Sequence, residues 1–208
     1  VVQTLSLLEN IRLHNPNCLF VFASSAEVYG SAQFVPMSMD HPIVPVSPYA
    51  ESKKSGESVC RLYRRIYGIN IKIVRNFNTF GAFQRDGEYG GVISKFKSLA
   101  REGKDLPVYG SGEQKRDYSD INKIIHGYYL VMTKDYFPEV IHFGSGSPVK
   151  IIDIARYISK RFNVDIKHET ERVGEIAVLH ADISEAVKHG YKSEEDFWQK
   201  LETYLDLE

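Results

Sequence analysis

The chain has 208 residues, with 43% hydrophobic and 25% charged residues and a formal net charge of -1, a composition typical of globular proteins. It has no Lys/Arg cluster typical of a nucleic-acid surface and no apolar run long enough to span a bilayer. Cys18 and Cys60 do not make a disulfide framework or a zinc site, and the seven histidines show no metal-ligand spacing. We therefore expect a cytoplasmic protein with reduced thiols and no metal, membrane or nucleic-acid partner.

The first part of the chain alternates helical patterns with short apolar runs. Residues 2–14 carry apolar side chains at helical spacing, and 19–23 is an apolar run that predicts a buried strand. A second helix is expected over 49–67, ended by Gly68, and a second strand over 69–74. Helices that alternate with buried strands predict a parallel sheet covered on both faces, which is an α/β fold.

The remaining residues continue this alternation less regularly. Two glycine-containing segments, 110–112 and 144–147, predict a hairpin turn and a strand-to-helix turn rather than phosphate-binding loops. The further elements expected are a helix opening at 92, strand 106–109, helix 121–134, strand 140–143, helix 151–162, strand 164–166 and helix 193–208.

Polar side chains follow the first strand and open the second helix. Ser25 stands at the carboxyl end of strand 19–23, in the run Ser-Ser-Ala-Glu-Val-Tyr-Gly. Tyr49 and Lys53 are four residues apart at the start of a helix and therefore share one face. A phenol beside an ammonium group, with a serine hydroxyl close by, predicts a proton-transfer site.

These two segments, 24–30 and 47–53, resemble the extended short-chain dehydrogenase/reductase family, in particular its NAD-dependent nucleotide-sugar epimerases and dehydratases. The resemblance implies the C-terminal part of a Rossmann-like parallel sheet with a smaller α/β substrate-binding domain. It places the later half of the dinucleotide-binding domain in 1–81. The nucleotide-sugar domain falls mainly in 82–208, with about 119–147 returning to the cofactor domain.

By the same resemblance, Ser25, Tyr49 and Lys53 are catalytic and the cofactor is NAD, with NADP left open. Tyr49 is the base, and Ser25 holds the substrate hydroxyl. A free phenol titrates near ~10, and the charge of Lys53 is expected to lower the pKa of Tyr49 toward working pH. The residues expected to line the cofactor are Ala23, Ser24, Tyr49, Lys53, Asn76 and Phe77.

The substrate that the resemblance implies is a nucleotide-diphosphate sugar. Arg116 lies in a Gln-x-Arg-Asp segment and Arg172 in an Arg-x-Gly-Glu segment, and guanidinium groups suit phosphate oxygens. An alternative for Arg116 is a surface ion pair with Asp117 or Asp120. An alternative for Asn78 is a turn residue at a strand end. The residues expected to contact the substrate are Asn78, Val92, Val108, Tyr109, Arg116, Arg172 and Glu175.

Enzymes of this family oxidise C4 of a hexose. The resulting 4-keto sugar is reduced from its other face, which is 4-epimerisation, or loses water across C5 and C6, which is 4,6-dehydration. Glu27 matches the C5 base of the dehydratases, whereas Ala26 stands where they carry an acid. The segments around Tyr49, Asn78 and 90–96 resemble epimerases, so we expect 4-epimerisation, with dehydration through Glu27 as the alternative. An ordinary solvent-facing or helix-capping acid is a third explanation for Glu27.

The family's glycine-rich loop, Gly-x-x-Gly-x-x-Gly, is expected before strand 19–23, and residues 1–18 do not contain it. We expect a native segment upstream of Val1. The alternative, from another class of function, is a truncated, non-catalytic fragment that binds a nucleotide sugar. Family members pair the helices corresponding to 2–14 and 49–67 across a two-fold axis, so a homodimer is expected.

Overall fold

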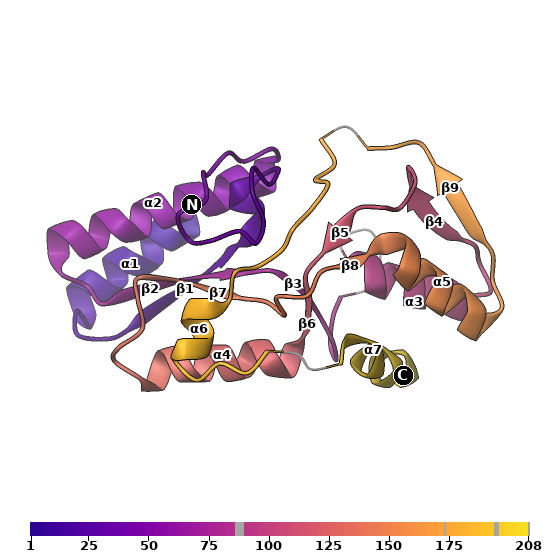
Figure 1. Ribbon diagram of the computed structural model, residues 1–208. Helices are drawn as coiled ribbons and strands as arrows, with labels where there is room; N and C mark the ends of the chain where they lie inside the picture. The colour runs from indigo at the N-terminus through magenta and orange to yellow at the C-terminus, as the bar shows by residue number, and fades with distance from the viewer. Residues whose placement is uncertain (86–89, 173, 194–195, 208) are drawn as a thin grey trace.

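The computed structural model describes residues 1–85, 90–172, 174–193 and 196–207 (Figure 1). At its centre is a parallel sheet of order β1-β2-β7. The strands are β1 (Phe20–Ser25), β2 (Ile71–Asn76) and β7 (Val140–Phe143). Parallel strands end at the same edge of a sheet, so the polar residues that follow β1 and β2 come together there.

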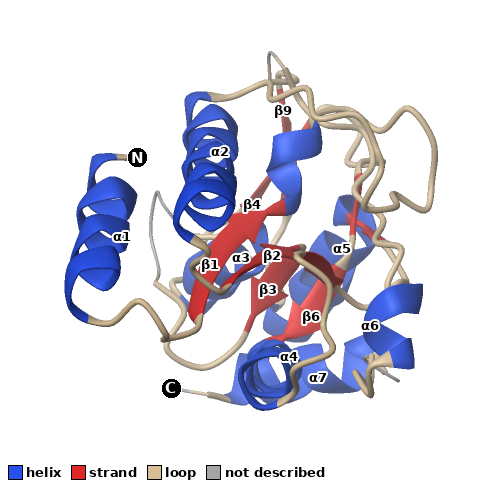
Figure 2. Cartoon of the chain, turned by 90° about the vertical axis from the view of Figure 1, so that its left-hand side faces the viewer, coloured by secondary structure: helices blue, strands red, loops and turns tan. Residues whose placement is uncertain are grey.

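Helices cover both faces of this sheet (Figures 1 and 2). α1 (Val2–His14) and α2 (Pro48–Tyr67) lie on one face, and α4 (Ile121–Thr133) and α6 (Ser184–Lys188) on the other. Because side chains alternate along a strand, Ile71 and Ile73 pack with α1 and α2, whereas Val74 packs with α4. The expected α/β fold with parallel strands is confirmed.

The position of α2 is set at its first turn and at one glycine. Ser47 caps the helix, its Oγ accepting a hydrogen bond from the backbone N–H of Ala50 at 3.1 Å. Gly56 faces the ring of Phe22 on β1 so closely that a Cβ there would lie 2.4 Å from a ring carbon. This close approach places the first turns of α2 beside the carboxyl end of β1.

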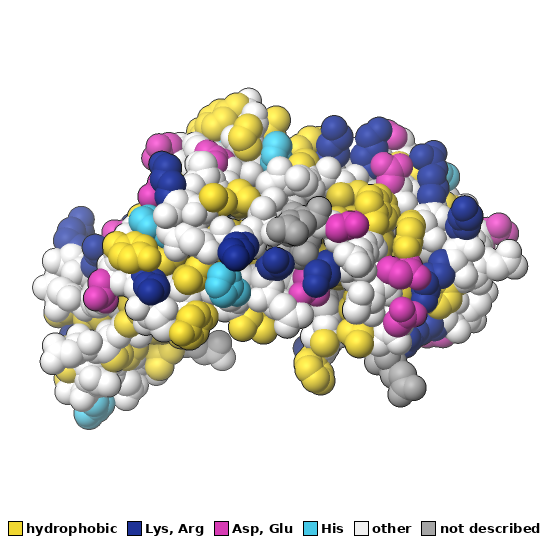
Figure 3. Space-filling model, turned by 60° about the horizontal axis from the view of Figure 1, so that its bottom comes forward, with side chains coloured by type: hydrophobic (Ala, Val, Ile, Leu, Met, Phe, Trp, Pro, Cys, Tyr) yellow, Lys and Arg dark blue, Asp and Glu magenta, His cyan; other side chains and the backbone are white. Residues whose placement is uncertain are grey.

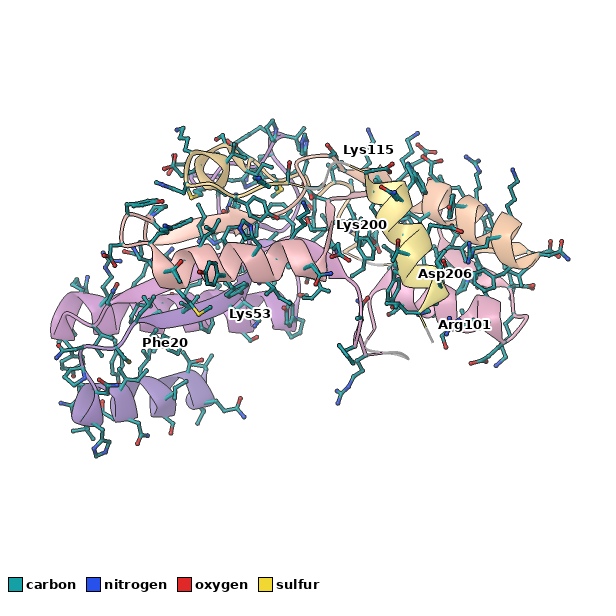
Figure 4. The ribbon with its side chains drawn as sticks, turned by 90° about the horizontal axis from the view of Figure 1, so that it is seen from below. Phe20, Lys53, Arg101, Lys115, Lys200 and Asp206 are labelled. Atoms are coloured by element: carbon teal, nitrogen blue, oxygen red, sulfur yellow. The ribbon has the colours of Figure 1, made fainter. Side chains whose placement is uncertain are left out.

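The rest of the chain builds a second lobe around its own core (Figure 1). β4 (Leu106–Tyr109) pairs in parallel with β9 (Ile166–Glu169), and α3 (Val92–Arg101), α5 (Ile151–Phe162) and α7 (Phe197–Asp206) complete this lobe. In Figure 4, Phe20 and Lys53 lie in the lobe of the central sheet, whereas Arg101 and Asp206 lie in the second lobe. The remaining elements are short: η1 (Ala26–Tyr29), β3 (Asn78–Phe80), β5 (Lys115–Arg116), β6 (Tyr118–Asp120) and β8 (Val149–Lys150).

Several expected boundaries differ from the structure. β1 extends through Ser25, and β9 begins at Ile166, where the expected strand 164–166 ends. Within the expected helix 193–208, α7 begins at Phe197, and positions 194–195 and 208 lie outside the described residues.

The expected hairpin at 110–112 is wrong, because β4 pairs with β9 and β5 pairs with β8. Gly110 and Gly112 have φ of 62° and 76°, a backbone region that favours glycine. Gly112 also packs closely against Ile152 at the start of α5. This tertiary contact carries the chain away from β4.

The surface is mixed in charge. On the face shown in Figure 3, basic and acidic side chains are interspersed. Of the helices in the described ranges, none combines the length and apolar character that crossing a membrane requires. Cys18 and Cys60 are free thiols, and among the residues placed by the structure no group of three or more His, Cys, Asp or Glu could hold a metal ion.

Candidate functional site

The ends of β1 and α2 bring together the three residues expected to be catalytic. Ser25 ends β1 and caps η1, its Oγ accepting from the backbone N–H of Glu27 at 3.2 Å. Tyr49 makes a side-chain hydrogen bond with Ser25. The Nζ of Lys53 donates to the carbonyl of Ala23 at 2.9 Å and lies 5.6 Å from the centre of the Tyr49 ring.

The expected lowering of the pKa of Tyr49 is not found. Half of the side chain is exposed. Burial of the remainder raises its pKa, and Glu27 raises it further, whereas the hydrogen bond with Ser25 opposes both. Burial also lowers the pKa of Lys53. The ammonium group of Lys53 is directed to the Ala23 carbonyl, not to the phenol oxygen, which accounts for the difference from the expectation.

The other residues expected near a cofactor occupy the same sheet edge with different roles. The hydroxyl of Ser24 donates to Glu57 at 2.6 Å, so this side chain is engaged inside the fold. The backbone N–H of Phe77 donates to the carbonyl of Phe143 at 2.9 Å. Asn76 donates through Nδ2 to the hydroxyl of Tyr128 at 2.8 Å, and its buried Oδ1 has no hydrogen-bond partner among the described residues. Asn76 therefore keeps a free acceptor near Ser25.

Between the two lobes lies a cavity of about 280 Å³. A smaller cavity of about 40 Å³ adjoins Ser25 and Asn76, and Glu27 and Asn78 line both cavities. The larger cavity is lined by six residues expected to bind substrate: Asn78, Val92, Tyr109, Arg116, Arg172 and Glu175. Sequence reasoning missed further lining residues: Gly90, Gly91, Lys95, Phe96, Pro107, Gln114, Tyr118 and Ile151.

Val108 was expected to contact substrate, but the structure places it elsewhere. It is fully buried in the core of the second lobe. Along β4 the side chains alternate, so Pro107 and Tyr109 face the cavity while Val108 points away from it. Lys95, which was missed, lies one helical turn after Val92. An i, i+3 search from Val92 would have found it.

Arg116 is paired, but with neither of the two partners considered. Its guanidinium donates to the carboxylate of Glu175, and both side chains are mostly buried. Asp117 instead accepts hydrogen bonds from the backbone N–H groups of Ser145 and Gly146 at 2.6 and 3.0 Å. Asp117 thus holds the strand-to-helix turn at 144–147, and Arg116 is left facing the cavity.

The cavity is polarised in charge. At one end the guanidinium of Arg172 lies 3.8 Å from the centre of the Tyr109 ring, with Lys95 5.8 Å from the same ring. The hydrogen bond from Arg172 and the charge of Lys95 lower the pKa of Tyr109. At the other end burial raises the pKa of Glu27, and the charge of Arg116 partly opposes this shift. Within the described ranges the Glu27 carboxylate has no ion pair and no side-chain hydrogen bond.

The chain is similar to known proteins over nearly its whole length. Residues 1–144 match the model of the NAD dependent epimerase/dehydratase family. The chain is 29% identical over 208 residues to a putative UDP-glucose 4-epimerase of Methanocaldococcus jannaschii, covering 99% of this chain and 68% of that relative.

Two solved structures share the fold of this chain. A UDP-N-acetylglucosamine 4-epimerase from Methanobrevibacter ruminantium, in complex with UDP-N-acetylmuramic acid, superposes with a TM-score of 0.91 at 32% identity. A dTDP-glucose 4,6-dehydratase from Streptomyces venezuelae with NAD bound has a TM-score of 0.89 at 26% identity. The epimerase match covers 99% of this chain and 67% of the epimerase. The dehydratase match covers 97% of this chain and 63% of the dehydratase. The chain therefore spans about two thirds of each structure.

Proposed function

Because the chain belongs to the NAD-dependent epimerase/dehydratase family, we propose that it carries the substrate side of an enzyme acting on a nucleotide-diphosphate sugar. The reaction proceeds through a 4-keto intermediate, and 4-epimerisation is its outcome. The observation that carries the proposal is the position of Ser25, which contacts Tyr49 and lines a small cavity. This small cavity shares Glu27 and Asn78 with the polarised cavity between the lobes. Relatives that act on UDP-sugars support the same assignment.

The residues at the sheet edge fit the nicotinamide end of NAD. Tyr49 and Lys53 border this edge, and the buried Oδ1 of Asn76 is an acceptor without a partner in the part of the chain that the structure describes. Ala23 is exposed there. When bound, NAD supplies a hydride acceptor and a positive charge near the phenol. Residues 1–208 contain no Gly-x-x-Gly-x-x-Gly loop for its pyrophosphate. Tyr49, Lys53 and Asn76 would therefore contact only the nicotinamide end of the cofactor.

Tyr49 takes the proton of the sugar C4 hydroxyl at its phenol oxygen. Ser25 orients that hydroxyl by hydrogen bonding, as it already does with Tyr49 itself. Lys53 fixes the first turns of α2 to β1 through its bond to Ala23, which holds Tyr49 at a constant distance from Ser25. Positioning of this kind is worth several orders of magnitude in rate.

The basic side chains that line the cavity bind the diphosphate. Arg116 and Arg172 present planar guanidinium groups that can each hold two phosphate oxygens. Tyr109 offers an aromatic face already occupied on one side by Arg172. The diphosphate therefore competes with Glu175 for Arg116, which frees Glu175 to accept hydrogen bonds from ribose hydroxyls.

A second outcome, 4,6-dehydration, is favoured by Glu27. Its unpaired carboxylate and raised pKa are what a base for the C5 hydrogen needs. Incubating the intact native protein with UDP- and dTDP-hexoses in D₂O separates the two outcomes. Epimerisation gives the C4 epimer without solvent deuterium, whereas dehydration gives a 4-keto-6-deoxy sugar that carries deuterium. A 4-keto-6-deoxy product would overturn epimerisation in favour of dehydration.

The assembly belongs to the same proposal. Apolar side chains on α1 and α2 are exposed, among them Leu7 and Ile66, and burying them between two copies would form the homodimer expected from the family. A light-scattering mass of one chain would contradict it. The division into a cofactor domain and a substrate domain also stays a proposal, supported by β7 returning to pair with β2.

A further inference from the structure

Five polar side chains, all buried, lie beneath the ends of β1, β2 and β7, and the proposed proton transfer uses none of them. We call these residues the buried network: Ser24, Tyr29, Glu57, Arg75 and His142. Ser24, Arg75 and His142 occupy matched positions on three neighbouring strands. Their side chains therefore form a row on the face of the sheet that α2 covers. α2 contributes Glu57, and η1 contributes Tyr29.

A buried ion pair forms the centre of the network. The Nε and Nη2 of Arg75 donate to the two carboxylate oxygens of Glu57 at 2.8 and 2.6 Å, and each side chain is 1% exposed. Burial alone would raise the pKa of Glu57, but the hydrogen bonds and charge of Arg75 outweigh it, so the pKa is lowered. Two parallel bonds from a planar guanidinium fix the relative orientation of α2 and β2.

The ion pair holds β1 on one side and η1 on the other. The hydroxyl of Ser24 donates to Glu57 at 2.6 Å, and the Nη1 of Arg75 donates to the hydroxyl oxygen of Tyr29 at 2.6 Å. The Nδ1 of His142 faces the carbonyl of Asp182 at 3.2 Å, and a carbonyl can only accept, so Nδ1 carries a ring hydrogen. Burial lowers the pKa of His142, so the ring is neutral and its Nε2 accepts from the hydroxyl of Tyr29, 2.5 Å away.

Ser24 and Tyr29 bracket the segment that holds Ser25 and Glu27. Both ends of this segment are thus tied to one rigid ion pair. Glu57 also lies one helical turn after Lys53, whose Nζ is bonded to Ala23. Two consecutive residues of β1 are therefore bound to side chains on one face of α2, the helix that presents Tyr49.

We propose that Glu57 and Arg75 are positioning residues that hold Ser25 and Glu27 in register with Tyr49, acting through Ser24 and Tyr29. The inference rests on the proposed function for its catalytic consequence. Neither Glu57 nor Arg75 lines the two cavities at the site. Glu57 and Arg75 fix the positions of Ser25 and Glu27 relative to Tyr49 and do not contribute to nucleotide binding.

Tyr29→Phe tests this in the intact native protein, because it removes one hydroxyl of the buried network and keeps the ring. Tyr191→Phe is the matched control, since Tyr191 is equally buried and its hydroxyl donates to Gly144, outside the network. We expect kcat to fall roughly 10- to 100-fold in Tyr29→Phe and not in the control. KM for the nucleotide sugar stays within about twofold, because Arg116 and Arg172 are untouched. Equal kcat in the two variants overturns the proposal.

A second readout does not depend on turnover. Nitrogen NMR of the His142 ring reports which nitrogen carries the hydrogen. The wild type is expected to show hydrogen on Nδ1, with a change of tautomer population in Tyr29→Phe alone. Hydrogen on Nε2 in the wild type would overturn the described chain of bonds. A wild type with this tautomer but without turnover refutes the proposed function and, with it, the catalytic part of the inference, while the chain of bonds stands.

If Tyr29→Phe does not fold, Ser24→Ala removes the other attachment of the segment and serves as the second variant. It is expected to lower kcat in the same range and to leave UDP affinity unchanged, because the hydroxyl that it removes is bonded to Glu57. Unchanged kcat in Ser24→Ala overturns the proposal.

Discussion

Lowering the pH from about 7 to about 5 is expected to destabilise the fold through His142. This side chain is 1% exposed. Burial, helped by the nearby charge of Arg75, lowers its pKa from 6.5 to about 4. In the unfolded chain His142 therefore takes up a proton near pH 6.5, whereas in the folded chain it does so only near pH 4. The stability linked to His142 is complete above pH 6.5 and is lost as the pH falls toward 4.

The size of the effect follows from the shift. Each pKa unit corresponds to about 1.4 kcal/mol, so the full shift is worth on the order of 3 kcal/mol. About 2 kcal/mol of this should be lost between pH 6.5 and about pH 5. That window lies above the pH at which ordinary carboxylates take up protons, so His142 can be separated from acid denaturation in general.

Urea unfolding at a series of pH values measures this directly, with His142→Gln as the comparison. Glutamine offers Tyr29 an acceptor and cannot be protonated in this range. The free energy of unfolding of the wild type should fall toward that of the variant as the pH drops from 6.5 to 5. A difference between the two proteins that stays constant over this range would refute the reasoning.

Three further changes test the contacts around the site. Glu57→Ala should lower the free energy of unfolding by about 3–5 kcal/mol, because Arg75 is left buried and without its carboxylate partner. The double variant Glu57→Leu with Arg75→Met should recover most of this loss. Urea unfolding that finds the double variant as unstable as Glu57→Ala would contradict this. Gly56→Ala should lower the free energy of unfolding by about 1–3 kcal/mol through the clash with Phe22. Helix propensity alone would raise the melting temperature of this variant, so a higher melting temperature would contradict the clash. Arg116→Ala should weaken UDP binding at least roughly tenfold in calorimetry, while the exposed Arg156→Ala should not; equal affinities would remove Arg116 from the phosphate site.

The proximity of the three residues expected to be catalytic could be predicted because their spacing is local. Tyr49 and Lys53 need only a helix, and Ser25 needs only a strand end, and the structure brings the three together. Their catalytic roles stay a prediction. The lining of the cavity by Arg116, Arg172 and Glu175 was anticipated from motifs alone. No local pattern, however, indicates that Arg116 and Glu175 pair with each other, because that contact joins segments 59 residues apart.

Other features depend on tertiary packing that no sequence window contains. The ion pair between Glu57 and Arg75 requires the register of α2 on β2, and nothing in either segment alone predicts that an arginine in a strand will be buried. Val108 was misplaced because a one-residue error along a strand reverses the face of the sheet. The turn at 110–112 was misread because its direction is set by the contact of Gly112 with Ile152.

The most direct test of the account is the turnover of nucleotide sugars by Tyr49→Phe in the intact native protein. Product analysis by NMR with UDP-hexoses should show the C4 epimer with the wild type and none with the variant. Calorimetry should show unchanged UDP affinity, because Tyr49 is not among the residues that line the cavity with Arg116 and Arg172. Equal conversion by wild type and variant would contradict the assignment of Tyr49 as the base and, with it, the account of this site.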